Sequence, residues 1–590
     1  MGSSHRNRVA VDPLRGWLDS FVSEIDQLSG RPSPLAVVKA VVAVGAAGFD
    51  VVIVDDDENA DLTSVVDRVD VPPGGWANPW LPGLVHERVV SLVDRKVRGA
   101  WYTPRSLVEG LVAFVGDCVD LPDFAVDPTC GGGAFLLAVL DRWVDCGVDP
   151  KHAVVRVAGT DIDPDAVQVC RWSLQLWAAG HGVDIEAESL DVSNADALVA
   201  AIPTAWPDRR LVIGNPPFAS PLKKGAIPES AQRYRELHSH DLGQYADLAA
   251  LHLHRCVDRV GDGSVVSLVL PQSVVSSRDV APFRRRIENE AATIGMWAAR
   301  EAVFDAGVRT CAPVLVPGRD QPSTVHLASG PTAAPVGTTK PGRWSAYAAR
   351  CLGGPPLPTS VTQPAVSLSS LCSATAGFRD EYYGLVSACR EWESDAEPPN
   401  RLITVGSVDP LVTSWGEDPI RFGGRRWAAP VIATDELNDK VRRWTKRQMK
   451  PKVVVATQSK LLEPVIDIAG RMIPSTPLLA VHTDLDDLGA VAAVCLAPPV
   501  VAAAWERWFG SALAVDALKL AASQLGELPL PPDRRIWQKA SALITDHATS
   551  VAPGDADHAR SLAAEVAALM NEAYRADSAV LKWWLERAGG

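Results

Sequence analysis

The stretch Val212-Ile-Gly-Asn-Pro-Pro-Phe218 joins a short apolar run to an abrupt stop. The apolar run predicts a buried strand, and the two prolines end it because they lack an N–H and restrict the residue that precedes them. The strand therefore presents Asn215 and Phe218 at the edge of a sheet. The Asn215 side-chain oxygen and the Pro216 carbonyl can accept hydrogen bonds from an amino group, and the Phe218 ring can stack on a planar base. Together with Pro217, these residues form a candidate catalytic site for chemistry on an exocyclic amine.

A glycine-rich segment follows another predicted strand earlier in the chain. Phe124 to Val126 reads as a strand, Asp127-Pro-Thr-Cys-Gly-Gly-Gly-Ala-Phe135 as a loop, and 136–143 as an apolar helix. Glycines between a strand and a helix let a ligand approach the backbone and the helix N-terminus. The spacing differs from the dinucleotide fingerprint GxGxxG, so a nucleoside ligand without phosphates fits at least as well. The candidate cofactor-binding residues in this segment are Asp127, Pro128, Cys130, Gly131, Gly133 and Phe135.

Acidic residues follow the next two predicted strands. Val155 to Gly159 leads into Thr160-Asp161-Ile162-Asp163, and Asp191 is expected at the end of a third strand-like segment. An acid at the tip of the second strand can accept hydrogen bonds from both ribose hydroxyls, and Asp191 could accept from an adenine amino group. Taken singly, such features are also common as turns, helix caps and loop acids. In this order they predict a doubly wound α/β sheet whose strand ends converge on one ligand crevice.

Four segments, taken in order, resemble the gamma-class DNA adenine-N6 methyltransferases of bacterial restriction–modification systems. They are Gly99-Ala-Trp-Tyr-Thr-Pro104, the segments 127–135 and 159–163, and Asn215-Pro-Pro-Phe218. The resemblance implies a Rossmann-like S-adenosylmethionine-dependent sheet, with the glycine loop shaping the cofactor pocket and Asn215–Phe218 holding the target base. It assigns the methionine part of the cofactor to Tyr102, Thr103 and Pro104. The ribose is assigned to Asp161 with Ile162, and the adenine to Asp191.

The function implied by this resemblance is site-specific methylation of adenine in duplex DNA. The methyl donor would be S-adenosylmethionine, and the target adenine would leave the stack because its amine is otherwise paired. A separate restriction or defence protein is a further candidate partner. Three alternatives stay open: an RNA adenine methyltransferase, a protein glutamine methyltransferase, and a DNA-binding modification subunit without catalysis.

Changes in composition, together with what the resemblance implies for residues 84–317 and 368–590, predict four parts of the chain. Residues 1–83 read as a mostly helical N-terminal segment, and residues 84–317 as the methyltransferase catalytic domain. Residues 318–367 are rich in Pro, Gly, Ser and Thr, which predicts a linker or insertion. Residues 368–590 have strand and hairpin character followed by helices, and they are expected to form a mixed α+β DNA target-recognition domain.

The net charge of −14 argues against a general polyanion binder, but one region has the opposite charge. Residues 421–460 contain eleven Lys or Arg against three acids, with Trp427 and Trp444 among them. Basic residues interleaved with aromatics are typical of surfaces that contact phosphates and bases. A solvated helix face is the alternative interpretation. The candidate DNA-binding residues are Arg425, Arg426, Lys446 and Lys450.

The ten cysteines include no CxxC pair and no Cys/His spacing typical of a metal site, so we expect reduced thiols and no metal. The most apolar N-terminal stretch, 35–54, is interrupted by Lys39 and Asp50 and lacks a basic leader. We therefore expect neither a signal peptide nor a membrane span. These features favour a cytoplasmic protein, and the resemblance implies a bacterial protein associated with the nucleoid.

Overall fold

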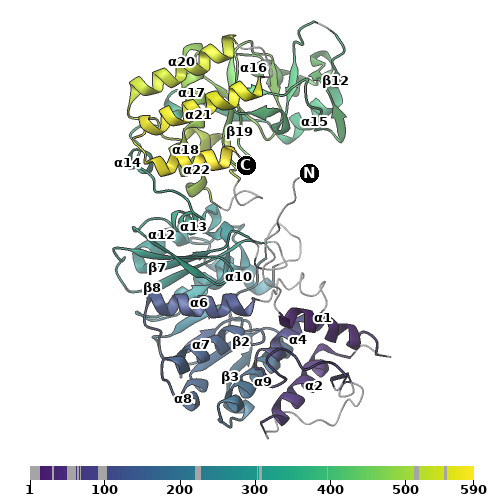
Figure 1. Ribbon diagram of the computed structural model, residues 1–590, viewed down its shortest axis with the longest axis vertical. Helices are drawn as coiled ribbons and strands as arrows, with labels where there is room; N and C mark the ends of the chain where they lie inside the picture. Colours follow the sequence, from purple (N-terminus) through teal and green to yellow (C-terminus); the bar gives the residue numbers. More distant parts are fainter. Residues whose placement is uncertain are drawn as a thin grey trace. The chain divides into compact units, whose positions relative to one another are not determined.

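The structure is a computed structural model, in which the chain forms two compact units, Met1–Leu352 and Gly353–Gly590 (Figure 1). Each unit is described by itself. The residues that the structure describes are 13–28, 32–49, 62, 65–66, 68–90, 103–219, 227–301, 303, 308–394, 396–509, 517–550 and 555–589.

The first unit is built on one large mixed sheet with the strand order β10-β9-β7-β8-β5-β4-β1-β2-β3, and β6 pairs with β8 at its side. β3, β2, β1, β4 and β5 are parallel neighbours, whereas β8 runs antiparallel to β5 and β7. This arrangement confirms the predicted doubly wound α/β sheet. The strands are β1 (Ala125–Asp127), β2 (Val157–Asp161), β3 (Asp191–Asn194), β4 (Leu211–Gly214), β5 (Val265–Leu268), β6 (Leu270–Pro271), β7 (Ala291–Ala298), β8 (Thr310–Pro317), β9 (Val325–Ser329) and β10 (Ala334–Thr339).

The strand order reverses between β1 and β4. The chain passes from β1 outward to β2 and β3, and it then returns to place β4 on the other side of β1. At such a reversal the connections leave the sheet in opposite directions and open a crevice at the carboxyl ends of the strands. The loops after β1, β2 and β4, which carry the predicted motifs, therefore meet at one place.

Helices cover both faces of this sheet, and the N-terminal helices extend the same core. α2 and α4 pack against α9, α1 packs against α4 (Figure 1), and one cluster of buried apolar side chains includes both Leu14 of α1 and Val265 of β5. The N-terminal segment is therefore part of the first unit's core. The helices are α1 (Pro13–Ile25), α2 (Pro34–Ala47), α4 (Leu81–Val89), α6 (Arg105–Cys118), α7 (Ala134–Asp145), α8 (Pro150–Val154), α9 (Pro164–Gly180), α10 (Glu229–Leu237), α11 (Leu248–Val257), α12 (Ala281–Glu290) and α13 (Trp344–Cys351).

The segment 318–367, for which the composition predicts a linker or insertion, is largely structured. It contributes β9, which pairs with β7, β10 at the sheet edge, and α13, which packs on β7. Most residues of β10 are exposed, as Gly, Pro and Thr are at an edge strand. A composition rich in turn-forming residues thus belongs here to a sheet edge, and the division between the two units falls after Leu352.

The second unit is mixed α+β, as predicted. It contains two four-stranded sheets, β11-β22-β19-β20 and β12-β18-β13-β21, and the hairpins β14–β15 and β16–β17. The helices α17, α20 and α21 pack on one another, and α15 packs against α16 (Figure 1). The strands are β11 (Ser373–Ala376), β12 (Cys389–Glu391), β13 (Arg401–Ile403), β14 (Val408–Asp409), β15 (Val412–Thr413), β16 (Ile420–Phe422), β17 (Arg425–Trp427), β18 (Pro430–Ile432), β19 (Lys452–Ala456), β20 (Glu463–Asp467), β21 (Met472–Pro474) and β22 (Leu479–His482). The helices are α14 (Thr359–Thr362), α15 (Arg379–Ala388), α16 (Asp439–Gln448), α17 (Leu488–Leu496), α18 (Pro498–Arg507), α19 (Ala522–Gly526), α20 (Arg534–Ser550), α21 (Ala556–Ala573) and α22 (Ser578–Ala588).

Within the described ranges, no single helix combines the length and the apolar composition needed to cross a membrane. The bent pair Leu485–Leu496 and Pro498–Arg507 meets that test only when its two helices are taken together.

Candidate active site and nucleic-acid interface

The loop between β1 and α7 is shaped by two glycines with positive φ. Gly131 has φ +51° and Gly133 has φ +88°, a backbone region that side chains with a Cβ rarely adopt. A Cβ added at Gly131 would meet no atom within 4 Å and would point into open space. The loop therefore exposes its backbone to a cavity, as a cradle for a ligand does.

Asp127, at the end of β1, forms a hydrogen bond with this loop. Its side chain is 1% exposed and accepts a hydrogen bond from the Thr129 N–H at 3.0 Å. Burial raises the pKa of Asp127 to about 8, although the Thr129 bond acts in the opposite direction. A Cβ at Gly214 would lie 2.3 Å from the Asp127 carboxylate, so only glycine lets β4 pass this close. Asp127 thus bonds to the glycine loop and packs against the end of β4.

Asp161, at the end of β2, is anchored by backbone donors. Its two carboxylate oxygens accept from the N–H groups of Gly131 and Asp163, both at 2.9 Å. Burial raises the pKa of Asp161, and these N–H bonds oppose the shift. Each carboxylate oxygen has a second lone pair that can accept from a ligand hydroxyl. The neighbouring Ile162 is 64% exposed and provides an apolar surface beside this carboxylate.

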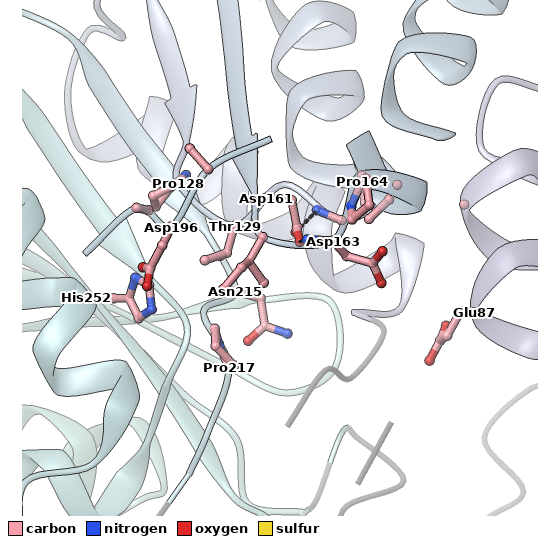
Figure 2. Close-up of a pocket in the computed structure, with 18 of the residues that line it drawn as sticks. Glu87, Pro128, Thr129, Asp161, Asp163, Pro164, Asp196, Asn215, Pro217 and His252 are labelled. Carbon is pink, nitrogen blue, oxygen red and sulfur yellow. Dashed lines mark hydrogen bonds between the residues drawn. The ribbon is translucent and has the colours of Figure 1, made fainter. Parts of the chain in front are cut away.

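Contrary to the prediction from the sequence, Asp191 does not end a strand, and the acid that follows β3 into the cavity is Asp196. β3 begins at Asp191, and its last residue, Asn194, pairs with Asp161. The Asp191 carboxylate is exposed, accepts a hydrogen bond from Trp206 Nε1 and does not line the cavity. Asp196 does line it (Figure 2). The bounds of β3 could not be predicted from hydrophobicity, because Val192 is its only buried residue.

Asn215 follows β4 at the centre of the crevice. Its Nδ2 donates a hydrogen bond to Thr103 Oγ1 at 3.0 Å, which fixes the orientation of the amide. Thr103 is 5% exposed and precedes Pro104, the N-cap of α6. The segment before α6 and the turn after β4 are thereby joined, 112 residues apart in sequence. Tyr102 lies outside the described residues.

These loops enclose a cavity of about 610 Å³ (Figure 2). That volume lies within the range of about 300–1,000 Å³ typical of small-molecule and cofactor sites. The predicted site residues that line the cavity are Pro128, Gly131, Asp161, Ile162, Asn215 and Pro217. The predicted residues that do not line it are Thr103, Pro104, Asp127, Cys130, Gly133, Phe135, Asp191, Pro216 and Phe218.

Two helices that the motif analysis did not include complete the walls. Trp80, Gly83 and Glu87 line the cavity from α4 and the residue before it, and His252 lines it from α11. α4 approaches the glycine loop closely, because a Cβ at Gly132 would lie 2.5 Å from the Gly83 Cα. No spacing motif marks these residues, and the only local signal is a glycine within a helix at position 83.

In the second unit, the hairpin β16–β17 and helix α16 form a basic surface. Phe422 of the hairpin packs in the same apolar cluster as Val441 and Trp444 of α16. Nine basic residues are exposed on these two elements and just after α16. They are Arg421, Arg425, Arg426, Lys440, Arg442, Arg443, Lys446, Arg447 and Lys450. We call these residues the basic surface.

Not all the cations counted in this region belong to that surface. Lys452 is fully buried in β19 and forms an ion pair with Asp467 of β20, so it cannot reach a phosphate. Lys440 pairs with Asp380, and Arg442 pairs with Asp439. Among the described residues, none of the four predicted DNA contacts, Arg425, Arg426, Lys446 and Lys450, forms an ion pair with a carboxylate.

Comparisons with known proteins agree with the fold. A family model described as N-6 DNA Methylase matches residues 89–327. The methylase subunit of the type I restriction enzyme MjaIX of Methanocaldococcus jannaschii is 28% identical over 127 residues, which is 21% of this chain and 20% of that subunit. The chain thus aligns with about a fifth of the length of this curated relative.

Solved structures resemble larger parts of the chain. The type IIL restriction–modification enzyme MmeI, in complex with DNA, has a TM-score of 0.52 at 11% identity, covering 98% of this chain and 93% of that one. A putative class I S-adenosylmethionine-dependent methyltransferase of Listeria monocytogenes has a TM-score of 0.39 at 14% identity, covering 54% of this chain and 91% of that one. The likeness to MmeI extends over both units and shows a shared fold. Residues 89–327, which carry the glycine loop, the Asp161 turn and the Asn-Pro-Pro-Phe turn, are thus the part of the chain that matches the N-6 DNA Methylase family model.

Proposed function

We propose that the protein is a site-specific DNA adenine methyltransferase of restriction–modification or phage-defence type, acting on duplex DNA in the bacterial cytoplasm with S-adenosylmethionine as methyl donor. The observation that carries the proposal is the convergence of Asp161, Asp196 and Asn215 on one cavity at the reversal of strand order. Such a cavity offers carboxylates to a nucleoside and an amide to an amine.

The cavity residues fit the proposed cofactor. Asp161 offers oxygens to ribose hydroxyls, Ile162 offers an apolar face to the adenine, and the open backbone at Gly131 leaves room for the methionine part. When bound, S-adenosylmethionine supplies an electrophilic methyl group. Asp127 keeps the glycine loop and β4 in register, so it positions the site without touching the ligand.

Asn215 and Pro216 act on the nucleophile. The Asn215 side-chain oxygen and the Pro216 carbonyl accept from the target amine and direct its lone pair toward the methyl group. Positive charge develops on the nitrogen as it attacks, and these fixed dipoles stabilise that charge. Phe218 stacks on the base, and base–aromatic stacking returns on the order of 1–3 kcal/mol of the cost of flipping. No covalent enzyme intermediate is required.

The basic surface of the second unit supplies the proposed contact with DNA. Arg425 and Arg426 lie on β17, while Lys446 and Lys450 lie at the end of α16 and just beyond it. Neutralising phosphates with such cations provides sequence-independent affinity and positions a reader on the duplex. We therefore assign target recognition to the second unit.

The direct test is transfer of labelled methyl groups by the purified full-length protein. We expect N6-methyladenine in duplex DNA, confined to one short sequence, when the product nucleosides are separated by mass spectrometry and the sites are mapped by methylation-sensitive sequencing. RNA and total protein serve as competing acceptors in parallel reactions. Label in RNA, in a protein amide or in cytosine would assign a different activity.

Two carboxylates provide a matched prediction for the cofactor site. Asp196→Asn should weaken binding of S-adenosylhomocysteine by roughly 1–3 kcal/mol, because a neutral amide oxygen replaces the stronger carboxylate acceptor that faces the cofactor adenine in an enclosed site. Asp191→Asn should leave the affinity unchanged, because that side chain is exposed and lies outside the cavity. Isothermal titration calorimetry on both variants measures the difference. The reverse pattern would return the adenine contact to Asp191.

A further inference from the structure

His252 occupies an unusual place for a histidine. It lies on α11, is 5% exposed, and lines the cavity together with Leu248, one helical turn earlier on the same face. α11 is held against the active-site turn, since the Leu248 N–H donates to the Ala219 carbonyl at 3.1 Å and Asp247 caps the helix. The backbone that carries His252 is therefore anchored next to the Asn-Pro-Pro-Phe turn.

The ring of His252 has no hydrogen-bond partner among the described residues, in contrast to its neighbour two positions later. His254 is fully buried, and its two ring nitrogens contact the Tyr234 hydroxyl at 2.8 Å and Asp241 Oδ2 at 3.2 Å. The ring of His252 lines the cavity, so its nitrogens are free to bond a ligand or a water there. His254 is thus a satisfied core residue, whereas His252 faces a site.

The charge state of His252 determines what it can offer. Burial lowers its pKa to about 4, although the carboxylate of Asp196 acts in the opposite direction. The ring is therefore neutral at neutral pH and carries one N–H donor. Asp196 lies next to it on the same side of the cavity (Figure 2). The pair presents one carboxylate acceptor beside one neutral donor.

We propose that His252 is a specificity-determining residue for the cofactor's base, donating its N–H to the adenine ring nitrogen next to the amino group while Asp196 accepts from that amine. This inference rests on the proposed function. Adenine carries a donor, its amine, next to acceptors at N1 and N7, which matches the Asp196–His252 pair. Hypoxanthine reverses the pattern at its Watson–Crick edge, with a carbonyl in place of the amine and an N–H at N1, so it would place an acceptor against Asp196.

Calorimetry with S-adenosylhomocysteine and its 1-deaza, 7-deaza and inosyl analogues tests this assignment on the full-length protein. For the parent, we expect the inosyl analogue and one of the two deaza analogues to bind about ten-fold more weakly than S-adenosylhomocysteine, the cost of one buried hydrogen bond. His252→Leu should bind S-adenosylhomocysteine about ten-fold more weakly and should no longer distinguish it from that deaza analogue. His252→Gln, which keeps an N–H donor, should restore part of the discrimination.

The controls separate the possible failures. His152→Leu makes the same change at an exposed position on α8 outside the cavity, and it should bind every ligand as the parent does. If the parent binds both deaza analogues as tightly as S-adenosylhomocysteine, or if the deaza penalty persists in His252→Leu, the role given to His252 is wrong. Should His252→Leu fail to fold, His252→Phe, which keeps a flat ring but has no N–H, replaces it in the same series. Binding of none of these ligands by the parent would instead contradict the proposed function.

Discussion

Asn215→Ala is expected to abolish most methyl transfer, by about 10² to 10³ in rate, while leaving the fold and the cofactor affinity intact. The Asn215 amide sits at the cavity, where its Nδ2 donates to Thr103 Oγ1 and thereby fixes its orientation. Removal of the Asn215 acceptor should raise the free energy of the transition state more than that of the ground state, because the amine becomes positively charged in the transition state. Initial rates with labelled S-adenosylmethionine and saturating DNA measure this loss.

Phe218→Ala provides the contrast for that experiment. Phe218 follows the two prolines, and its proposed role is stacking on a base that has entered the site. We expect its loss to reduce the flipped population of a fluorescent adenine analogue placed at the target position. In Asn215→Ala the flipped population should stay close to that of the parent. A parent-like methylation rate in Asn215→Ala would make the Asn-Pro-Pro-Phe turn structural and the proposed activity wrong.

The second large effect is expected from the basic surface. Replacing Arg425, Arg426, Lys446 and Lys450 together by Ala should lower the slope of log affinity against log salt by about 4 units, since each phosphate contact contributes about 0.9. All four side chains are exposed, so the fold should tolerate the change. Binding of a target duplex, measured by fluorescence anisotropy between low and moderate salt, gives the slope.

A matched variant controls for net charge. Replacing Arg534, Arg535, Lys539 and Lys582 by Ala removes the same four charges from exposed positions on α20 and α22 of the same unit. It should retain most of the parent's salt dependence, because long-range effects of net charge are screened within about 10 Å at 0.1 M salt. Equal slopes for the two quadruple variants would show that the basic surface is a solvated helix face.

The turns that carry the motifs were predictable from the sequence. The double proline ends β4 because prolines lack an N–H, and the glycines before α7 adopt positive φ values. Both effects are local, so they can be predicted without knowledge of the fold. Because parallel strands point their carboxyl ends to one edge, the order of these motifs along the chain also predicts that they meet. Asp161 and Asn215 lie where that reasoning places them, at one cavity.

The corrections all concern residues whose position depends on contacts distant in sequence. Asp191 begins β3 where a strand end was expected, and only the pairing of Asn194 with Asp161 shows that Asp196 reaches the cavity. Lys452 counts as a basic residue by composition, yet its pairing with Asp467 across two strands buries it. The predicted linker supplies strands because β9 finds a partner in β7.

By itself, the sequence determined the doubly wound sheet, the order of its functional turns and the amide and carboxylate chemistry at their tips, since turn geometry and hydrophobic runs are local properties. Only the tertiary structure decided which side chains close the cavity. Gly83 on α4 and His252 on α11 reach it because helices pack against the sheet through side chains far apart along the chain. Local propensities carry no record of such contacts, because packing selects them from the many surfaces that each helix presents.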